Sequence, residues 1–190
     1  MTGKADGGSD SHENFSRCSG FNGQFWHHVV TMTNAQNCRY WLMKSEPGEV
    51  SIDDLAAAPG KTLPWFGVRN YQARNFMRDA MQIGDRAFFY HSSCAAPGIA
   101  GICEIASDAY PDATQFSAAS PYFDAKATLA QPRWWLRDVR FLGKTRLISL
   151  AELRARPELA TMRLLARGNR LSITPVSAEE WRFITKELLP

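Results

Sequence analysis

The chain has 190 residues, of which 45% are hydrophobic and 22% charged, and its formal net charge is +3. This length suits one domain, or one domain with a tail, and is sufficient to bury a core. A charge of +3 permits nucleic-acid binding without requiring it. No apolar run approaches the roughly 20 residues that a membrane-spanning helix needs, so we expect a soluble, cytoplasmic protein with no membrane partner.

Charge is unevenly distributed along the sequence. Residues 40–130 contain seven Lys or Arg against ten Asp or Glu, whereas residues 131–190 contain twelve against six. Most cations of the second region are arginines, which suit bidentate phosphate contacts and stacking on rings. A merely Arg-rich, solvated surface is the alternative interpretation.

The cysteines predict neither a zinc site nor a disulfide framework. They show no CxxC pair and no regular spacing, and few histidines lie near them. Free thiols in a reducing cytoplasm are the simplest explanation. We therefore expect no metal and no cofactor. The four cysteines are Cys18, Cys38, Cys94 and Cys103.

Residues 1–38 differ in composition from the rest. They are rich in Gly, Ser, Asn, His and Thr and show no sustained periodicity, which is typical of a disordered extension. Met32 stands shortly before the first predicted strand. Our hypothesis is that Met32 is the biological start and that the upstream residues follow from a misplaced start codon. The predicted domain covers residues 39–190.

The first half of the domain alternates strands and helices. Residues 40–44 lack polar alternation and predict a strand buried on both faces. A serine cap with an acid three residues later predicts a helix over 51–58. Asn70 is a good N-cap for a helix that ends near residue 81. The predicted buried face of that helix contains Ala73, Phe76, Met77 and Ala80.

The second half adds a hairpin and a longer irregular stretch. Residues 86–91 and 98–106 predict an antiparallel pair, and residues 107–133 are expected to be irregular. Later elements are predicted strands at 134–141 and 171–175 and helices from Ser149, over 158–167 and from Ser177. This order predicts an α+β fold with a small, curved, mixed or antiparallel sheet or barrel flanked by helices.

Three segments place polar groups beside aromatic side chains at the end of a strand or the start of a helix. They are residues 44–46, 65–74 and 90–92. If they converge, they form a pocket with a stacking ring, hydrogen-bonding groups and a cationic rim. The structural alternatives are a core role for Trp65, a surface role for Lys44 and an internal hydrogen-bonding role for His91.

Several longer motifs accompany these segments. They are YWLMKSEP at 40–47, WFGVRNYQARN at 65–75, GD at 84–85, FYHS at 89–92, GIAGI at 98–102, YPD at 110–112, QF at 115–116, PRW at 132–134, VRF at 139–141 and RLSITP at 170–175. Together they resemble the EVE-domain family of the PUA-like superfamily, which also contains ASCH and YTH domains. The resemblance covers roughly residues 39–184.

The resemblance implies a PUA-like fold and a pocket similar to the modified-base pocket of YTH domains. Lys44, Ser45 and Trp65 are the positions that match that pocket. No motif decides which further aromatics close it. The full predicted set of nucleic-acid-binding residues is Lys44, Ser45, Glu46, Trp65, Gly67, Val68, Arg69, Asn70, Arg74, His91, Ser92, Tyr122 and Trp134, with Phe123 as a further candidate.

We therefore predict a monomeric nucleic-acid-binding module that recognises a methylated or hydroxymethylated base in single-stranded or base-flipped nucleic acid. DNA and RNA both remain open as ligands. The alternatives are a nucleic-acid-processing enzyme and an RNA-binding regulator. A binding module is favoured, because the adjacent His91 and Ser92 of a strand point to opposite faces and no catalytic motif is present.

Overall fold

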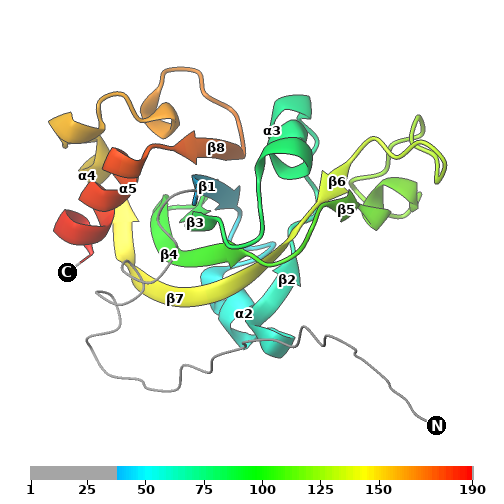
Figure 1. The fold of residues 1–190 in the computed structure, drawn as a ribbon, viewed down its shortest axis with the longest axis horizontal. Coiled ribbons are helices and arrows are strands. Elements are labelled where there is room, and N and C mark those ends of the chain that lie inside the picture. Colours follow the sequence, from blue (N-terminus) through cyan, green and yellow to red (C-terminus); the bar gives the residue numbers. More distant parts are fainter. Residues whose placement is uncertain (1–37, 190) are drawn as a thin grey trace, which may run out of the picture. The chain divides into compact units, whose positions relative to one another are not determined.

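The computed structural model describes residues 38–189, so the expectations of a disordered extension and of a start at Met32 lie outside the described residues. A six-stranded sheet has the order β2-β7-β4-β3-β1-β8. It curves strongly, with β7 sweeping beneath β4 (Figure 1). The strands are β1 (Tyr40–Ser45), β2 (Thr62–Pro64), β3 (Arg86–His91), β4 (Gly98–Ile105), β7 (Asp138–Ser149) and β8 (Ile173–Val176), and β5 (Tyr110–Pro111) pairs separately with β6 (Trp135–Leu136).

The sheet is mixed. β1 and β3 are parallel, whereas the other pairs described are antiparallel, including the predicted β3–β4 pair. Within residues 38–189 the edge strands β2 and β8 do not pair with each other, so the sheet is open. The predicted PUA-like α+β fold, a curved sheet flanked by helices, is confirmed.

Each longer helix begins at a polar cap that the sequence predicted. The caps are Ser51, Asn70, Ser149 and Ser177, whose side-chain oxygens accept hydrogen bonds from backbone N–H groups of the first turn. The helices are α2 (Ile52–Ala57), α3 (Tyr71–Asn75), α4 (Leu150–Arg154) and α5 (Ala178–Phe183). Single π-helical turns continue α3 over Phe76–Ala80 and α5 over Ile184–Leu188.

Both faces of the central strands are buried, as the absence of polar alternation predicts. Met43 and Phe89 belong to the core beneath α2 and α3. Leu42 and Phe88 face the opposite side and are fully buried. There the ring of Trp181 in α5 stacks on Phe88, with centroids 4.1 Å apart.

Close packing around β4 requires a residue without a side chain. A Cβ on Gly101 would lie 2.5 Å from Cδ1 of Ile52 and 2.7 Å from the carbonyl oxygen of Gly143. α2 and β7 thus approach β4 from two directions at this point. This approach brings the loop between β1 and α2 close to the sheet.

One predicted helix is wrong. Instead of a helix over 158–167, the chain forms two 3₁₀ turns at Pro157–Leu159 and Arg163–Leu165. The buried side chains here are Leu159, Met162 and Leu164. Their spacing of three and then two residues does not lie on one stripe of an α-helix.

Candidate functional site

A cavity of about 460 Å³ lies where β1 and β3 end. Because these strands are parallel and in register, Ser45 is level with His91, and the N–H of Ser92 donates to the carbonyl of Ser45 at 2.8 Å. The three polar segments of the sequence therefore converge here. The predicted residues that line the cavity are Lys44, Ser45, Glu46, Trp65, Gly67, Val68, Arg69, Asn70, Ser92 and Tyr122.

Trp65 combines a core position with a place in the cavity wall. Only 8% of its surface is exposed, and its ring packs edge-on against Phe89 with centroids 5.3 Å apart. Its backbone N–H donates to the carbonyl of Arg137, which fixes the start of the turn beyond β2. The core role and the wall role are thus compatible for this side chain.

A second aromatic, Tyr122, reaches the cavity from the long loop before β6. Its ring packs against Gly67, where φ is +82° and a Cβ would lie 2.8 Å from Cζ of the tyrosine. Its hydroxyl donates to Oε1 of Glu49. Desolvation and the hydrogen bond to Glu49 raise the pKa of Tyr122 to about 12, so it stays a donor at neutral pH. Residues far apart in sequence thereby meet across the cavity wall.

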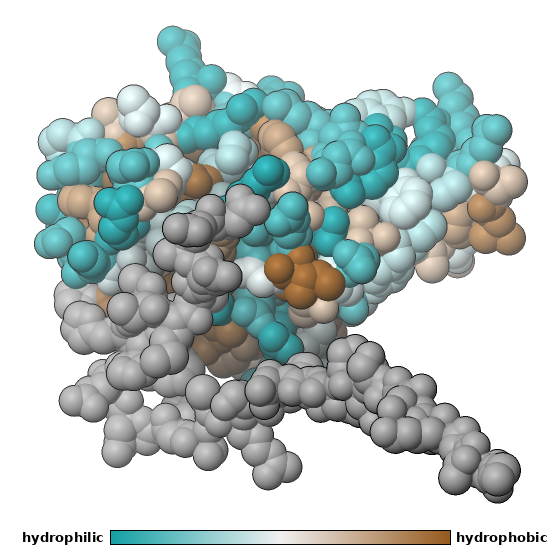
Figure 2. Space-filling view, in the orientation of Figure 1, coloured by the Kyte–Doolittle hydropathy of each residue, from teal (hydrophilic) through white to brown (hydrophobic). Residues whose placement is uncertain are grey.

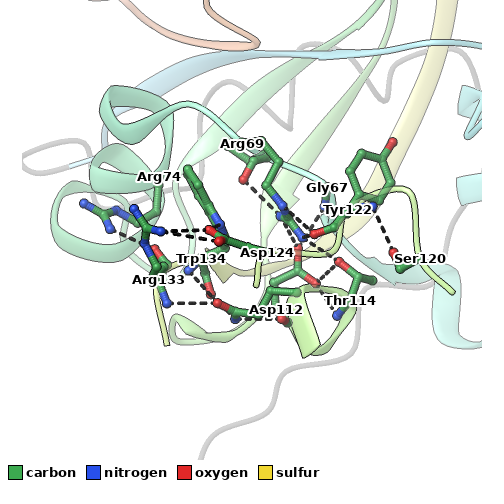
Figure 3. Close-up of polar contacts among 12 residues, drawn as sticks. Gly67, Arg69, Arg74, Asp112, Thr114, Ser120, Tyr122, Asp124, Arg133 and Trp134 are labelled. Carbon is green, nitrogen blue, oxygen red and sulfur yellow. Dashed lines mark hydrogen bonds and ion pairs between the residues drawn. The ribbon is translucent and has the colours of Figure 1, made fainter. Parts of the chain in front are cut away.

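Arg69 holds this loop in place (Figure 3). Its Nε donates to the carbonyl oxygen of Tyr122 at 2.9 Å, and its Nη1 pairs with Asp112 at 2.8 Å. Its Nη2 donates to Oγ1 of Thr114 and to the Tyr122 carbonyl, and Nη1 also contacts the carbonyl of Val68. The guanidinium therefore has internal partners on each nitrogen.

Asp112 is the anion at the centre of this network and is almost fully buried. Burial alone would raise its pKa, but hydrogen bonds from Thr114, Arg69 and the N–H of Gly67 outweigh burial and hold the pKa below its usual value. The sequence contained this residue within the YPD motif. Its position before a short helical turn, where an Asp is a good cap, was the available signal.

The polar groups of the cavity differ in how far they are already engaged. Oδ1 of Asn70 accepts from the N–H groups of Gln72 and Ala73 in its predicted capping role, which leaves its NH₂ group. The hydroxyl of Ser45 donates to the carbonyl of Val50 at 2.7 Å, which leaves its oxygen as an acceptor. Each residue therefore keeps one hydrogen-bonding group for a ligand, the NH₂ group of Asn70 as a donor and the hydroxyl oxygen of Ser45 as an acceptor.

Two cations stand at the cavity without an ion-pair partner among the described residues. They are Lys44 and Arg170. They belong to neighbouring segments, since the N–H of Lys44 donates to the carbonyl of Ser172 at 2.7 Å. Desolvation lowers the pKa of the half-buried Lys44. This part of the site is suited to an anionic group.

Three residues of the predicted set, together with the further candidate Phe123, lie outside the cavity lining. Nη1 of Arg74 donates to the carbonyl of Arg133, and Nε2 of His91 accepts from the N–H of Ile52. Nε1 of Trp134 donates to Asp124, and its ring stacks on Tyr71. Desolvation lowers the pKa of His91. Contact of these residues with nucleic acid stays a prediction.

Sequence reasoning did not single out several other lining residues. Glu49 belongs to the loop that follows Pro47, and Ser172 and Arg170 belong to the RLSITP motif, so only family resemblance signalled the latter two. The additional lining residues are Glu49, Val50, Leu55, Leu63, Pro64, Phe66, Phe89, Ser93, Val139, Arg170 and Ser172.

The described chain offers no metal cluster and no membrane-spanning element. Across residues 38–189, no group of three or more His, Cys, Asp or Glu side chains could hold a metal ion. No helix in that part of the chain is long and apolar enough to cross a membrane.

The family model for the EVE domain matches residues 39–187. The chain therefore belongs to the EVE-domain family, as the sequence motifs indicated. Human thymocyte nuclear protein 1 is 45% identical over 163 residues, which cover 76% of this chain and 72% of that protein. The chicken protein of the same name is 44% identical, and the match spans 66% of its length.

Solved structures agree with this membership. A Pseudomonas syringae protein is 49% identical with a TM-score of 0.73, covering 76% of this chain and 96% of that one. Human THYN1, crystallised in complex with DNA that contains 5-methylcytosine, is 45% identical with a TM-score of 0.73. That match covers 77% of this chain and 95% of the human chain.

Proposed function

We propose that this EVE-domain protein binds DNA and takes one modified base, such as 5-methylcytosine, into the cavity between Trp65 and Tyr122. The observation that carries the proposal is a cavity of about 460 Å³ whose lining includes the aromatic side chains of Trp65 and Tyr122. This volume lies within the range of roughly 300–1,000 Å³ for small-ligand sites. The 5-methylcytosine DNA bound by human THYN1 supports the choice of base.

The chemistry of the lining suits a base that has left its stack. Aromatic contact with a base is worth about 1–3 kcal/mol. The hydroxyl of Ser45 and the amide of Asn70 offer hydrogen bonds to polar atoms of the base. Lys44 and Arg170 offer charge for a neighbouring phosphate, which makes affinity dependent on salt.

Fluorescence anisotropy with short oligonucleotides tests this proposal. Single-stranded and duplex DNA and RNA carrying cytosine, 5-methylcytosine or 5-hydroxymethylcytosine are titrated with wild type and with Trp65→Leu. We expect about tenfold tighter binding of one modified DNA, because one methyl group in a fitted pocket contributes about 1–3 kcal/mol. Trp65→Leu is expected to remove most of this preference while retaining an apolar side chain in the core.

Trp135→Leu is the matched control, because Trp135 lies in β6 and does not line the cavity. Thermal unfolding of both variants confirms that each is folded. Equal binding of all oligonucleotides by wild type, or equal preference in wild type and Trp65→Leu, would contradict the proposal. A preference for modified RNA over DNA would redirect it to the alternative of an RNA-binding regulator.

A further inference from the structure

We propose that the cavity selects a pyrimidine that carries an amine at position 4, and that Glu49 is the residue that recognises this amine. The inference rests on the proposed function, because it concerns the base that the cavity would hold. It names a substrate class, cytosine-type rather than thymine- or uracil-type bases. It also names a residue that determines specificity.

The carboxylates of the cavity are the first observation. Glu46 and Glu49 both contribute to its lining. Nucleic acid is a polyanion, so a carboxylate beside it repels phosphates unless it faces a hydrogen-bond donor. A carboxylate accepts only, and the exocyclic amine of cytosine is a donor that Glu and Asp bind. Thymine and uracil present a carbonyl oxygen at the same position, which a carboxylate repels.

The second observation distinguishes the two glutamates. Oε1 of Glu49 accepts from the hydroxyl of Tyr122, and its Oε2 has no partner among the described residues. Tyr122 is in turn seated against Gly67 and held through its carbonyl by Arg69. Glu46 makes no side-chain hydrogen bond within the described part of the chain. Glu49 is therefore the preorganised carboxylate, with one oxygen fixed and the other available.

The position of Tyr122 links recognition of the amine to stacking. Because the hydroxyl of Tyr122 contacts Glu49, a base that lies against the Tyr122 ring would direct its polar edge toward the free oxygen of Glu49. Tyr122 is a positioning residue in this arrangement, because its hydroxyl orients the carboxylate. A role for Glu49 only in anchoring Tyr122 is the competing explanation, and it predicts equal losses for all bases.

Four single-stranded DNA oligonucleotides separate the methyl group from the amine. They are identical except for cytosine, 5-methylcytosine, uracil or thymine at one central position. Comparison of 5-methylcytosine with cytosine, and of thymine with uracil, measures the effect of the methyl group. Comparison of 5-methylcytosine with thymine, and of cytosine with uracil, measures the effect of the amine. Affinities are measured for the full chain by fluorescence anisotropy at one salt concentration.

We expect wild type to bind 5-methylcytosine about ten- to a hundredfold more tightly than thymine, the range of a good contact to a base edge. Glu49→Gln should reduce this ratio to about twofold, because an amide can turn either its oxygen or its NH₂ toward the base. The preference of the Glu49→Gln variant for 5-methylcytosine over cytosine should remain. Tyr122→Phe keeps the ring but releases Glu49, and should give an intermediate ratio.

Glu187→Gln is the matched control, since it makes the same substitution at an exposed glutamate outside the cavity lining and should leave the ratio unchanged. Loss of the methyl preference in wild type would sink the proposed function. A retained methyl preference without discrimination against thymine, or discrimination that survives Glu49→Gln, would overturn the present inference alone. Equal weakening of all four oligonucleotides by Glu49→Gln would also overturn it, in favour of the anchoring role. Absence of binding to any oligonucleotide overturns both.

Discussion

Asp112 accepts four hydrogen bonds although it is almost inaccessible to water. The donors are the N–H of Gly67 at 3.0 Å, Arg69 at 2.8 Å, and the N–H and hydroxyl of Thr114 at 2.9 and 2.6 Å. Such a carboxylate connects the turn at Gly67 with the loop that carries Tyr122. At the scale of single residues, Asp112 thus joins two parts of the cavity wall.

We expect Asp112→Asn to destabilise the fold by about 3 kcal/mol, because removal of one partner leaves Arg69 uncompensated in a largely buried site. Urea denaturation at pH 7 measures the change in the free energy of unfolding. Asp79→Asn is the control, because its ion pair with Arg78 is exposed and should contribute less than about 1 kcal/mol. Equal effects of the two substitutions would show that the Asp112 network does not stabilise the fold.

Stability should also depend on pH through Asp112. Its pKa is lowered in the folded protein, whereas in the unfolded chain it is near 3.9. The stabilising contribution is thus present above about pH 4 and is lost as the pH falls through the folded pKa. Denaturation between pH 3 and pH 7 should show the difference between wild type and Asp112→Asn shrinking at the acidic end. A difference that is constant with pH would exclude this linkage.

Substitution of Gly67 tests whether the ring of Tyr122 contributes to recognition of the modified base. In Gly67→Ala the positive φ is strained, at a cost of about 1–2 kcal/mol, and the new methyl group meets the Tyr122 ring. Gly84→Ala has similar strain, with φ of +91°, but nothing lies within 4 Å of its Cβ. We expect only Gly67→Ala to weaken preference for the modified base. Equal preference in both variants, measured by anisotropy, would argue against a role for the Tyr122 ring.

Residue types and the family resemblance together indicated much of this site but not the contacts within it. Trp65, Lys44 and Ser45 could be predicted because each stands where a strand ends or a helix begins. The partners of Arg69 could not, since they lie in a loop more than 40 positions away. A predicted phosphate contact and an internal contact look identical in sequence for an arginine. Only the geometry of the loop distinguishes the two.

At the scale of elements, the ring of Trp181 packs α5 against the sheet. Trp181 stacks between Phe88, at 4.1 Å, and Tyr40, at 4.6 Å between ring centroids. This contact lies on the face of the sheet opposite the core that contains Trp65. The helix and the cavity should therefore contribute independently to stability and binding.

Trp181→Ala should destabilise the protein by about 3–5 kcal/mol, as expected for truncation of a buried aromatic. At temperatures where the Trp181→Ala variant is folded, its ratio of affinities for modified and unmodified DNA should equal that of wild type. Phe183→Ala, on the same helix but half-buried, should cost less. Chemical denaturation and anisotropy measure the two quantities. A changed ratio would mean that α5 and the cavity are coupled.

Element prediction succeeded where burial is continuous and was incomplete where it is not. The apolar runs of β1, β3 and β4 were predicted with nearly their observed bounds. β7 continues to Ser149, well past the predicted end at residue 141. Its later part alternates exposed Lys144 and Arg146 with half-buried residues, and pairing with β4 holds it. Such long-range pairing leaves little signal in local composition.

At the scale of the whole molecule, one segment concentrates the positive charge. Residues 154–170 contain five exposed arginines and the single acid Glu158. Arg170, at the end of this segment, lines the cavity. Hydrophilic side chains cover much of the surface around α4 and the chain that follows it (Figure 2). By contrast, the strand cations Lys144 and Arg146 pair with Asp53 and Glu152.

We expect Arg163→Ser with Arg167→Ser to weaken binding of modified and unmodified duplexes alike. The slope of log affinity against log salt should fall by about 0.9 for each phosphate contact removed. Arg146→Ser is the control, because its charge is already paired. Anisotropy measures the slopes between about 50 and about 300 mM salt, a range that brackets physiological ionic strength. An unchanged slope in the double variant would exclude this segment as the phosphate-binding face.

The parallel pairing of β1 with β3 has a consequence for the kinetics of folding. Pairing of these strands closes a loop of residues 46–85, which carries the turn at Trp65. Tyr122 lies in a second long excursion, between β4 and β6. Closing long loops is slow, whereas β3 and β4 are joined by a short one. We therefore expect the cavity to be among the last parts to form, and a bound base to slow unfolding without accelerating folding.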